Sequence, residues 1–236
     1  VLGGWMDSIP MLVFSGQARY ATTVPASGLP LRSMGVQECN IVPVGSSITK
    51  YAHMVVHPED IRYHLEKALY MAVTGRPGPV WLDIPLDVQG AVIETENLRA
   101  YDPAENPEQK PREIPQKTIE KILDKIEESH RPVLSPGNGV RLAGAIGEFH
   151  ELTELLGVPV VTGMSSVDAM ESDHPYFAGR SGGTGTRAGN FALQNSDVLL
   201  SIGNRQGFTQ TGFQYQDWAR ESYTILNDID ENELKK

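Results

Sequence analysis

The chain has 236 residues, of which 40% are hydrophobic and 21% charged, and its formal net charge is −10. The acidic balance and the lack of a Lys/Arg cluster argue against a nucleic-acid partner, and no apolar stretch reaches the ~20 residues that span a bilayer. The single cysteine, Cys39, excludes an internal disulfide and a cysteine-rich metal site, so we expect a reduced, cytoplasmic setting.

The first ninety residues alternate between apolar runs and a periodic segment. Residues 9–14 form a near-continuous apolar run of the length expected for a buried parallel strand. Residues 17–35 are rich in small and turn-forming residues and predict a long loop, and residues 36–56 predict a short helix followed by a strand. Apolar side chains recur at helical spacing over residues 59–74. Residues 79–84 are then a second buried strand, reached by the return half of a crossover unit.

The composition changes over residues 91–115, where prolines alternate with Glu, Asp and Lys. This segment is too polar to bury and too rich in proline for a helix, so we expect a linker that proteases cut between Asp102 and Gln116. We place the domain boundary here. The chain also begins without an initiator methionine and closes where a strand hands over to a helix, so we expect a fragment of a longer protein.

The segments after the linker again alternate between helical and strand patterns. The predicted helices are Gln116–Ser129, Ala143–Leu156 and Arg187–Gln194. The predicted strands lie in "PVLSPGNG", "VPVVTG", "DVLLSIGNR" and "YTILNDID". This alternation predicts an α/β fold with a parallel, doubly wound sheet, so we expect two parallel-sheet α/β units joined by a Pro-rich linker.

Glycines and acids follow the strands of the second unit. The four strand ends are Gly137-Asn138-Gly139, Thr162-Gly163, Gly203-Asn204-Arg205 and Asp228-Ile229-Asp230. Ligands of such sheets collect at the carboxyl ends of the strands. Bare glycine N–H groups and an arginine suit phosphate, and an aspartate suits ribose hydroxyls, so the four ends together predict a nucleotide site.

A plainer interpretation stands beside this one. Gly-Asn-Gly alone is typical of a tight strand-to-helix turn, and Leu142 stands where the dinucleotide fingerprint needs its third glycine. The segment Gly179–Asn190 could equally be a flexible surface loop.

Other candidate residues indicate structure rather than chemistry. The six histidines are scattered without metal-ligand spacing, so we predict no metal site. Cys39 is expected to be a small buried side chain, and Asp83 to cap a turn beside Pro85.

A set of motifs then follows in order along the chain. They are "DSIPMLVFSGQ", "VQECNIV", "SSITKYA", "TGRPGPVWLDIPLDV", "RPVLSPGNG", "GVPVVTG", "HPYFAGRSGGTGT", "NSDVLLSIGNR" and "NDIDENEL". Over essentially its whole length the chain resembles acetolactate synthase and related thiamine-diphosphate-dependent 2-oxoacid enzymes. The resemblance implies that residues 1–90 are the C-terminal part of the pyrimidine-binding domain and residues 116–236 most of the central domain.

The resemblance also implies where the cofactors would lie. The family's catalytic glutamate would precede Val1, and its metal and diphosphate motif, Gly-Asp-Gly followed by Asn, does not occur here. Thiamine diphosphate and Mg²⁺ are therefore expected mostly outside this chain, and Gln17 and Gln37 are the only active-site candidates. FAD is the family's central-domain ligand, and the matching positions are Gly137, Asn138, Gly139, Thr162, Gly182, Thr184, Gly203, Arg205 and Asp228.

Three positions depart from the family pattern. Thr184 replaces a common His, and Gly207 and Thr209 stand where an Asp and a second Arg are usual. An ADP-like nucleotide or an empty site is therefore an alternative to FAD.

The function implied for the parent protein is decarboxylating carboligation, in which two pyruvates give 2-acetolactate and CO₂, with this chain inactive by itself. Alternatives are a related decarboxylase or acetyltransferase, or a non-catalytic nucleotide-binding or interaction module. The implied partners are a small 2-oxoacid and further copies of the chain in a homodimer or homotetramer.

Overall fold

The computed structural model describes residues 1–107 and 113–235, and the remainder of the expected linker lies outside the described residues. Contacts between Cα atoms divide the chain into two compact units, Val1–Lys110 and Pro111–Lys236. Each described helix is too short or too polar to cross a membrane. We call the two parts unit 1 and unit 2 and treat each by itself.

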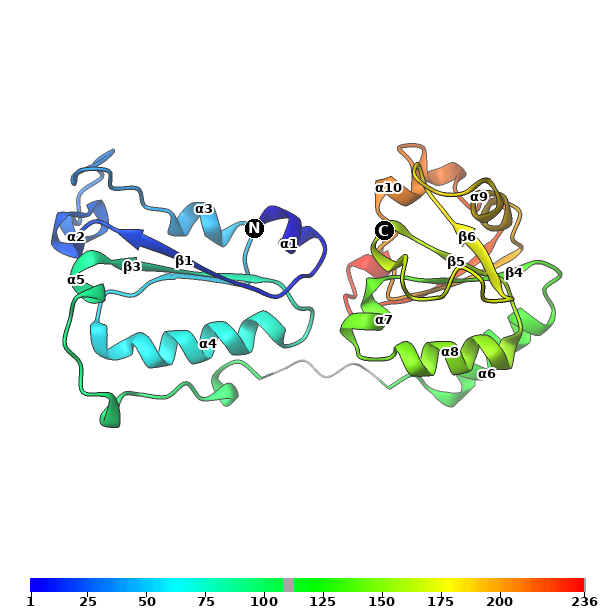
Figure 1. Cartoon of the computed structure of the whole chain (residues 1–236), viewed down its shortest axis with the longest axis horizontal. Helices are drawn as coiled ribbons and strands as arrows, with labels where there is room; N and C mark the ends of the chain where they lie inside the picture. Colours follow the sequence, from blue (N-terminus) through cyan, green and yellow to red (C-terminus); the bar gives the residue numbers. More distant parts are fainter. Residues whose placement is uncertain (108–112, 236) are drawn as a thin grey trace. The chain divides into compact units, whose positions relative to one another are not determined.

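Unit 1 is a three-stranded parallel sheet with helices on both faces (Figure 1). Its strands are β1 (Met11–Gln17), β2 (Tyr51–Met54) and β3 (Pro79–Pro85), in the order β1-β3-β2. Its helices are α1 (Leu2–Met6), α2 (Val24–Ser27), α3 (Val42–Ser46), α4 (Ile61–Val73) and α5 (Leu86–Gln89). The sheet thus has β3 at its centre, as its continuous apolar sequence predicts.

Helix α4 covers one face of this sheet. Ala68 and Ala72 are buried on the helix face that packs against Val80 and Leu82 of β3. On the opposite face, Gly45 of α3 lies against Trp81, and an added Cβ there would be 3.3 Å from the indole ring. Small residues therefore let both helices approach the central strand closely.

Strand β1 differs from the prediction of a buried strand. It pairs only with β3 in the described sheet, and its Phe14 side chain is 52% exposed. An edge strand lacks a neighbour on one side, so an apolar run can be exposed there even though its sequence resembles that of a central strand.

Asp83 was expected to cap a turn, and this expectation is wrong. Asp83 lies inside β3 and is only 1% exposed. Its carboxylate accepts hydrogen bonds from Ser15 Oγ at 2.6 Å and Gln17 Nε2 at 3.0 Å, both on β1. A buried carboxylate is tolerable because these donors on the neighbouring strand satisfy it.

Part of the expected linker packs on unit 1. Tyr101 is only 7% exposed, and its N–H donates to Glu66 Oε2 of α4 at 2.8 Å. Composition alone predicts that this segment is unburied, but Tyr101 attaches it to unit 1 through its buried ring and its N–H group.

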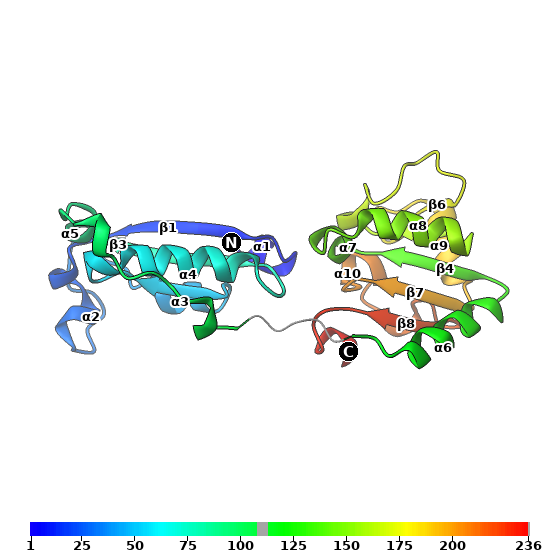
Figure 2. The same ribbon diagram turned by 90° about the horizontal axis from the view of Figure 1, so that it is seen from below.

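Unit 2 is a five-stranded, wholly parallel sheet. Its strands are β4 (Pro132–Pro136), β5 (Val160–Thr162), β6 (Phe177–Arg180), β7 (Val198–Ile202) and β8 (Tyr223–Asn227), in the order β6-β5-β4-β7-β8. Strands β4, β7 and β8 can be followed side by side in Figure 2. The chain moves outward from β4 first to one edge and then to the other, which is the doubly wound order expected from the sequence.

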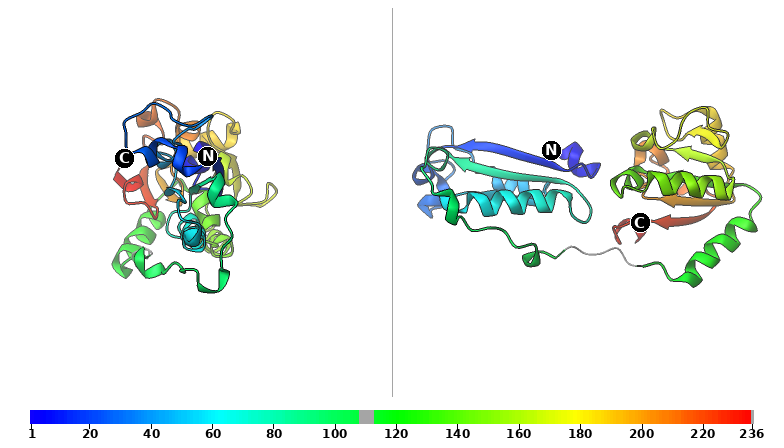
Figure 3. Two further views of the ribbon diagram at one scale, coloured as in Figure 1. Left: turned by 90° about the vertical axis from the view of Figure 1, so that its left-hand side faces the viewer. Right: turned by 60° about the horizontal axis from the view of Figure 1, so that its bottom comes forward.

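Helices cover both faces of this sheet (Figure 3). They are α6 (Gln116–Glu127), α7 (Asn138–Leu142), α8 (Ile146–Leu156), α9 (Arg187–Gln194) and α10 (Phe208–Thr211). Phe149 of α8 packs with Leu134 and Val160 on one face, and Leu193 of α9 packs with Val133 and Val161 on the other. Alternate residues of β4 and β5 thus serve opposite cores.

The loop before β4 is held by Asp197, which directly precedes the neighbouring strand β7. Asp197 accepts hydrogen bonds from the Ser129 hydroxyl and from the N–H groups of His130 and Arg131, each N–H at 2.9 Å. Burial by itself raises the pKa of Asp197, but these donors outweigh it and lower the pKa to about 2.

Candidate functional site

The predicted strand ends of unit 2 follow strands of one parallel sheet. Gly137 directly follows β4 and Gly203 directly follows β7, and these two strands are hydrogen-bonded neighbours. Asp228 follows β8, the next strand outward, and Thr162 ends β5 on the other side of β4. All four therefore lie along the carboxyl edge of the sheet.

The glycines at this edge allow one backbone to pack on another. A Cβ added to Gly137 would lie 2.1 Å from the Gly203 oxygen, and one added to Gly139 would lie 2.7 Å from Gly203 Cα. Gly203 itself has φ +57°, a conformation that favours glycine. The backbones of the β4 and β7 loops thus pack directly on each other at three glycines.

The N–H groups of these glycines are already engaged. Gly137 donates to the Ile202 carbonyl at 2.8 Å, Gly139 to the Gly203 carbonyl at 2.9 Å, and Gly203 to the Asn227 carbonyl at 2.7 Å. The expectation of bare N–H groups at these three glycines is therefore wrong, because the N–H groups are bound to carbonyls at the end of β7, in the loop after it and at the end of β8.

The loop after β6 is held in the same way. The Gly182 N–H donates to Asn190 Oδ1 at 2.8 Å, and Asn190 Nδ2 donates back to the Gly182 carbonyl at 3.1 Å. A Cβ on Gly182 would lie 2.4 Å from the Thr209 carbonyl oxygen. The alternative of a flexible loop over Gly179–Asn190 is not what the structure shows, since this segment includes the end of β6 and the first half of α9.

With these glycine N–H groups engaged, polar side chains are the groups that could hold a ligand at this edge. Asn138 and Arg205 are partly exposed and Thr184 is exposed. The Arg205 guanidinium lies over Gly207, 3.5 Å from where a Cβ would stand. Asp228 accepts the Asp230 N–H through Oδ1 at 2.9 Å. This set offers one cation, one carboxylate, a hydroxyl and an amide.

Thr162 differs from these because its side chain faces the interior. It is fully buried, and among the described residues its Oγ1 has no hydrogen-bond partner. Thr162 shares a face of β5 with Val160, which belongs to the core under α8. The Thr162 side chain therefore lies in the core beneath the carboxyl edge, although its backbone is at that edge.

Two residues that the sequence analysis missed organise this edge. Ser166 Oγ accepts the Gly163 N–H at 3.0 Å and donates to the Pro136 carbonyl at 2.7 Å. Gln210 is buried, and its Nε2 donates to Ser181 Oγ at 2.9 Å. Neither carries a local sequence signal, because each acts on a strand end at least three and as many as thirty residues away.

Gln17 of unit 1 is committed to structure. Its Nε2 donates both to Asp83 and, at 2.6 Å, to the Cys39 carbonyl, while its Oε1 accepts the Ala18 N–H at 3.0 Å. Gln17 therefore ties the end of β1 to the segment that carries Gln37.

Gln37 lies in that segment as an exposed residue with φ +60°. Its neighbour Glu38 accepts the N–H groups of Val24 at 2.7 Å and Met34 at 2.8 Å, which hold the pKa of Glu38 below its usual range. Cys39 is exposed, so the expectation of a buried cysteine is wrong. The turn made by Glu38 presents its neighbours to solvent.

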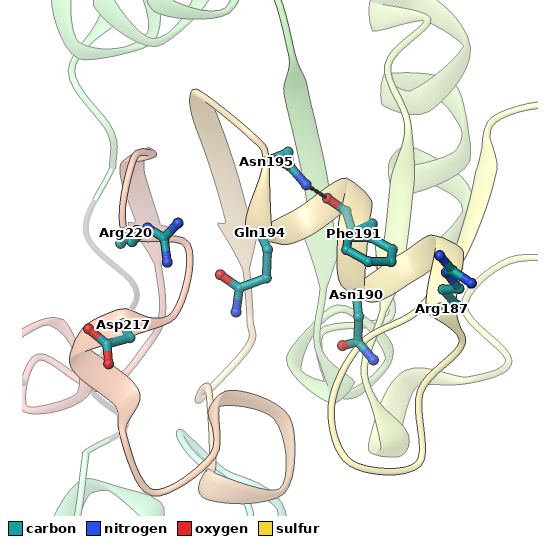
Figure 4. Close-up of a pocket in the computed structure, with 7 residues that line it drawn as sticks. All are labelled: Arg187, Asn190, Phe191, Gln194, Asn195, Asp217 and Arg220. Atoms are coloured by element: carbon teal, nitrogen blue, oxygen red, sulfur yellow. Dashed lines mark hydrogen bonds between the residues drawn. The ribbon is translucent and has the colours of Figure 1, made fainter.

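A groove of about 530 Å³ lies along α9 (Figure 4). It is lined by Arg187, Asn190, Phe191, Gln194, Asn195, Asp217 and Arg220. Its amides hold backbone: Asn190 pairs with Gly182, Gln194 Oε1 accepts the Ala219 N–H at 3.1 Å, and Asn195 Nδ2 donates to the Phe191 carbonyl at 2.8 Å. The amide side chains of the groove thus serve the fold, and Asn190 joins the groove to the loop that carries Gly182.

A metal centre finds no support in the part of the chain that the structure describes. No group of three or more His, Cys, Asp or Glu side chains converges there. The two histidines that do approach each other, His53 and His64, are stacked ring on ring rather than aimed at a common point.

The five-stranded parallel sheet with helices on both faces defines unit 2 as a doubly wound α/β domain. Residues 119–236 match the family described as thiamine pyrophosphate enzyme, central domain. The chain belongs to the thiamine pyrophosphate enzyme family.

Curated relatives extend this similarity over 98% of the chain. It is 35% identical to the acetolactate synthase large subunit of Corynebacterium glutamicum, 32% to the isozyme 1 large subunit of Escherichia coli and 32% to acetolactate synthase 1, chloroplastic, of Zea mays. The chain spans 35%, 38% and 34% of the length of these relatives.

Proposed function

We propose that this chain is part of a decarboxylating carboligase that depends on thiamine diphosphate and converts two pyruvates to 2-acetolactate and CO₂. The observation that carries the proposal is the similarity to acetolactate synthase large subunits over both units, at 32–35% identity. Because the chain spans only about a third of these relatives, the activity is assigned to the complete protein.

The residues present do not fit magnesium-bound thiamine diphosphate. The described part of the chain gathers no set of metal ligands, and the sequence contains no Gly-Asp-Gly motif. Residues 1–236 alone are therefore inactive, and no catalytic step is assigned to them. In this proposal the substrate is a small 2-oxoacid, and the complete protein works as a homodimer or homotetramer in the cytoplasm.

For the central domain we propose a nucleotide held by side chains rather than by backbone N–H groups. Arg205 would bind phosphate and the second carboxylate oxygen of Asp228 would bind ribose, with Asn138 and Thr184 beside them. Because the glycine N–H groups are used between loops, and Gly207 and Thr209 carry no charge, an ADP-like moiety fits better than a flavin. An empty site is the competing interpretation.

The products made by the complete reading frame that encodes these residues test the function. With pyruvate, thiamine diphosphate and Mg²⁺, we expect 2-acetolactate that disappears when thiamine diphosphate is left out. Acetaldehyde as the main product would favour a decarboxylase, and acetyl transfer to another acceptor an acetyltransferase. No pyruvate consumption by the folded protein would favour the non-catalytic module.

A further inference from the structure

A segment of unit 1 is strapped across helix α4. We call residues 98–106 the strap. The Tyr101 N–H donates to Glu66 as described above, the Tyr63 hydroxyl donates to Glu105 Oε2 at 2.6 Å, and Arg62 Nη1 donates to the Leu98 carbonyl at 3.4 Å. The strap is therefore fixed at its start, middle and end by three side chains of one helix.

Aromatic rings fill the space under the strap. The Tyr101 ring meets the Tyr63 ring edge-on at 5.6 Å, and Tyr63 in turn meets His64 edge-on at 5.1 Å. His64 stacks on His53 of β2, with ring centroids 4.1 Å apart. A continuous path of ring contacts thus joins the strap to the sheet, and we call His53 and His64 the histidine pair.

Neutral histidines suit this arrangement. The Tyr51 hydroxyl lies 2.7 Å from His64 Nδ1. This nitrogen can accept a hydrogen bond from the hydroxyl only when it carries no proton itself. Stacked imidazoles at 4.1 Å would repel each other if both carried charge. Burial, together with the neighbouring His53, lowers the pKa of His64 to about 4, and burial and Lys67 lower the pKa of His53.

Two cations already occupy the cluster. Lys67 Nζ lies 5.1–5.8 Å from the ring centroids of Tyr51, Tyr63 and Tyr101, and the Arg99 guanidinium carbon lies 4.1 Å over the Tyr63 ring. A charge on either histidine would be a third cation in the same aromatic box. Opening the strap would remove Arg99 and let water reach the rings.

We propose that the strap is a pH-sensitive clasp that opens when the histidine pair takes up protons. The titratable and charged groups around the pair, and along the ring contacts that lead from it to the strap, come from three elements packed together. They are Tyr51 of β2; Asp60, Arg62, Tyr63, Glu66 and Lys67 of α4 and the turn before it; and Arg99, Tyr101, Asp102 and Glu105 of the strap.

The carboxylates in this set do not reverse the direction of the effect. Asp60 raises the pKa of both histidines, but desolvation, Lys67 and Arg99 outweigh it at His64. Hydrogen bonds from Arg62 and from the Tyr101 N–H lower the pKa of Glu66, and hydrogen bonds from Tyr63 and Arg99 lower the pKa of Glu105, so both stay charged as the pH begins to fall. The histidines therefore respond first.

The size of the effect follows from proton linkage. Opening removes Arg99 and lets water reach the rings, so the pKa values of the histidines move up toward their ordinary value of ~6.5 and the open state binds more protons as the pH falls below that value. The opening equilibrium then rises by up to about tenfold per pH unit for each histidine until the closed-state pKa is reached. Between pH 7.5 and pH 5 we expect at least about a tenfold increase.

The Tyr101 amide reports opening directly, because its N–H is bound to Glu66 only when the strap is closed. Its hydrogen exchange is measured by NMR on the ¹⁵N-tyrosine-labelled chain of residues 1–236, corrected for the intrinsic pH dependence of exchange. The Tyr223 amide of β8, which donates to the Asp197 carbonyl at 2.8 Å, serves as a reference in unit 2.

The double variant His53→Gln, His64→Gln should lose most of the pH dependence, since glutamine can accept the Tyr51 hydroxyl but does not titrate. His57→Gln, outside the pair, should keep it. If the double variant does not fold, a pH titration of the His53 and His64 ring proton shifts in the unmodified chain tests the proposal. The midpoints of these shifts should fall below pH 6.5, in the same pH range in which Tyr101 exchange increases. A Tyr101 exchange that changes less than about twofold from pH 7.5 to 5, or an unaltered profile in the double variant, would overturn the proposal.

Discussion

Replacing Gly139 by alanine separates the two explanations for the glycines at the carboxyl edge. The new Cβ would lie 2.7 Å from both Cα and O of Gly203, which are backbone atoms that cannot swing away. Overpacking of this kind costs about 1–3 kcal/mol or more, and alanine's better helix propensity in α7 returns up to ~1 kcal/mol. We expect a net loss of roughly 1–2 kcal/mol with no ligand present.

Urea unfolding of the whole chain measures this loss, with Trp218 fluorescence reporting on unit 2. Gly147→Ala is the matched control, because an added Cβ meets nothing within 4 Å in α8, and we expect it to change stability by less than ~1 kcal/mol in the favourable direction. If Gly139→Ala left the unfolding midpoint unchanged and instead abolished nucleotide binding, the glycine would serve a ligand, and our account of the loops would be wrong.

Three further outcomes follow from the contacts described above. Arg205→Ala should weaken ADP binding by ~1.5–3 kcal/mol in calorimetric titration, whereas an unchanged affinity removes Arg205 from the site, and no binding of ADP or FAD favours an empty edge. Asp83→Asn places an amide donor opposite the Gln17 amide donor and should destabilise unit 1 by about 1–3 kcal/mol. The exposed Asp87→Asn is the near-neutral control, and equal unfolding midpoints for the two variants would refute this. Because the pKa of Asp197 is lowered to about 2, its contribution is complete above pH ~4 and is lost as the pH falls toward 2. Asp197→Asn should therefore flatten the acid dependence of unit 2 unfolding in that window, and an unaltered dependence would contradict the assignment.

Much of the fold follows from local patterns. Residues 59–74 and 187–194 repeat apolar side chains at helical spacing, and α4 and α9 form there, while β3 and β7 arise from short apolar runs. Strand β6, "FAGR", was missed because its four residues include a glycine with φ +124° and carry no alternation. Residues 177–180 form a strand because they pair with β5, and this pairing cannot be read from the residues next to β6 in the sequence.

The candidate site was predictable in position but not in detail. The rule that ligands meet the carboxyl ends of parallel strands placed Gly137, Gly203 and Asp228 on one edge. It could not indicate that Gly139 donates to Gly203, 64 residues later in the sequence, because loop-to-loop bonds depend on how closely β4 and β7 pack. Asp83 and Cys39 were misassigned for the same reason, since Gln17 and the β1–β3 register decide their environment.

A segment exchange tests the central claim that the chain serves as part of an acetolactate synthase. In the Corynebacterium glutamicum large subunit, the aligned segment is replaced by residues 1–236, and acetolactate formation from pyruvate is measured with and without thiamine diphosphate. We predict thiamine-diphosphate-dependent acetolactate formation, which a chimera lacking the segment should not show. A folded chimera that binds thiamine diphosphate and yet forms no acetolactate would contradict the claim.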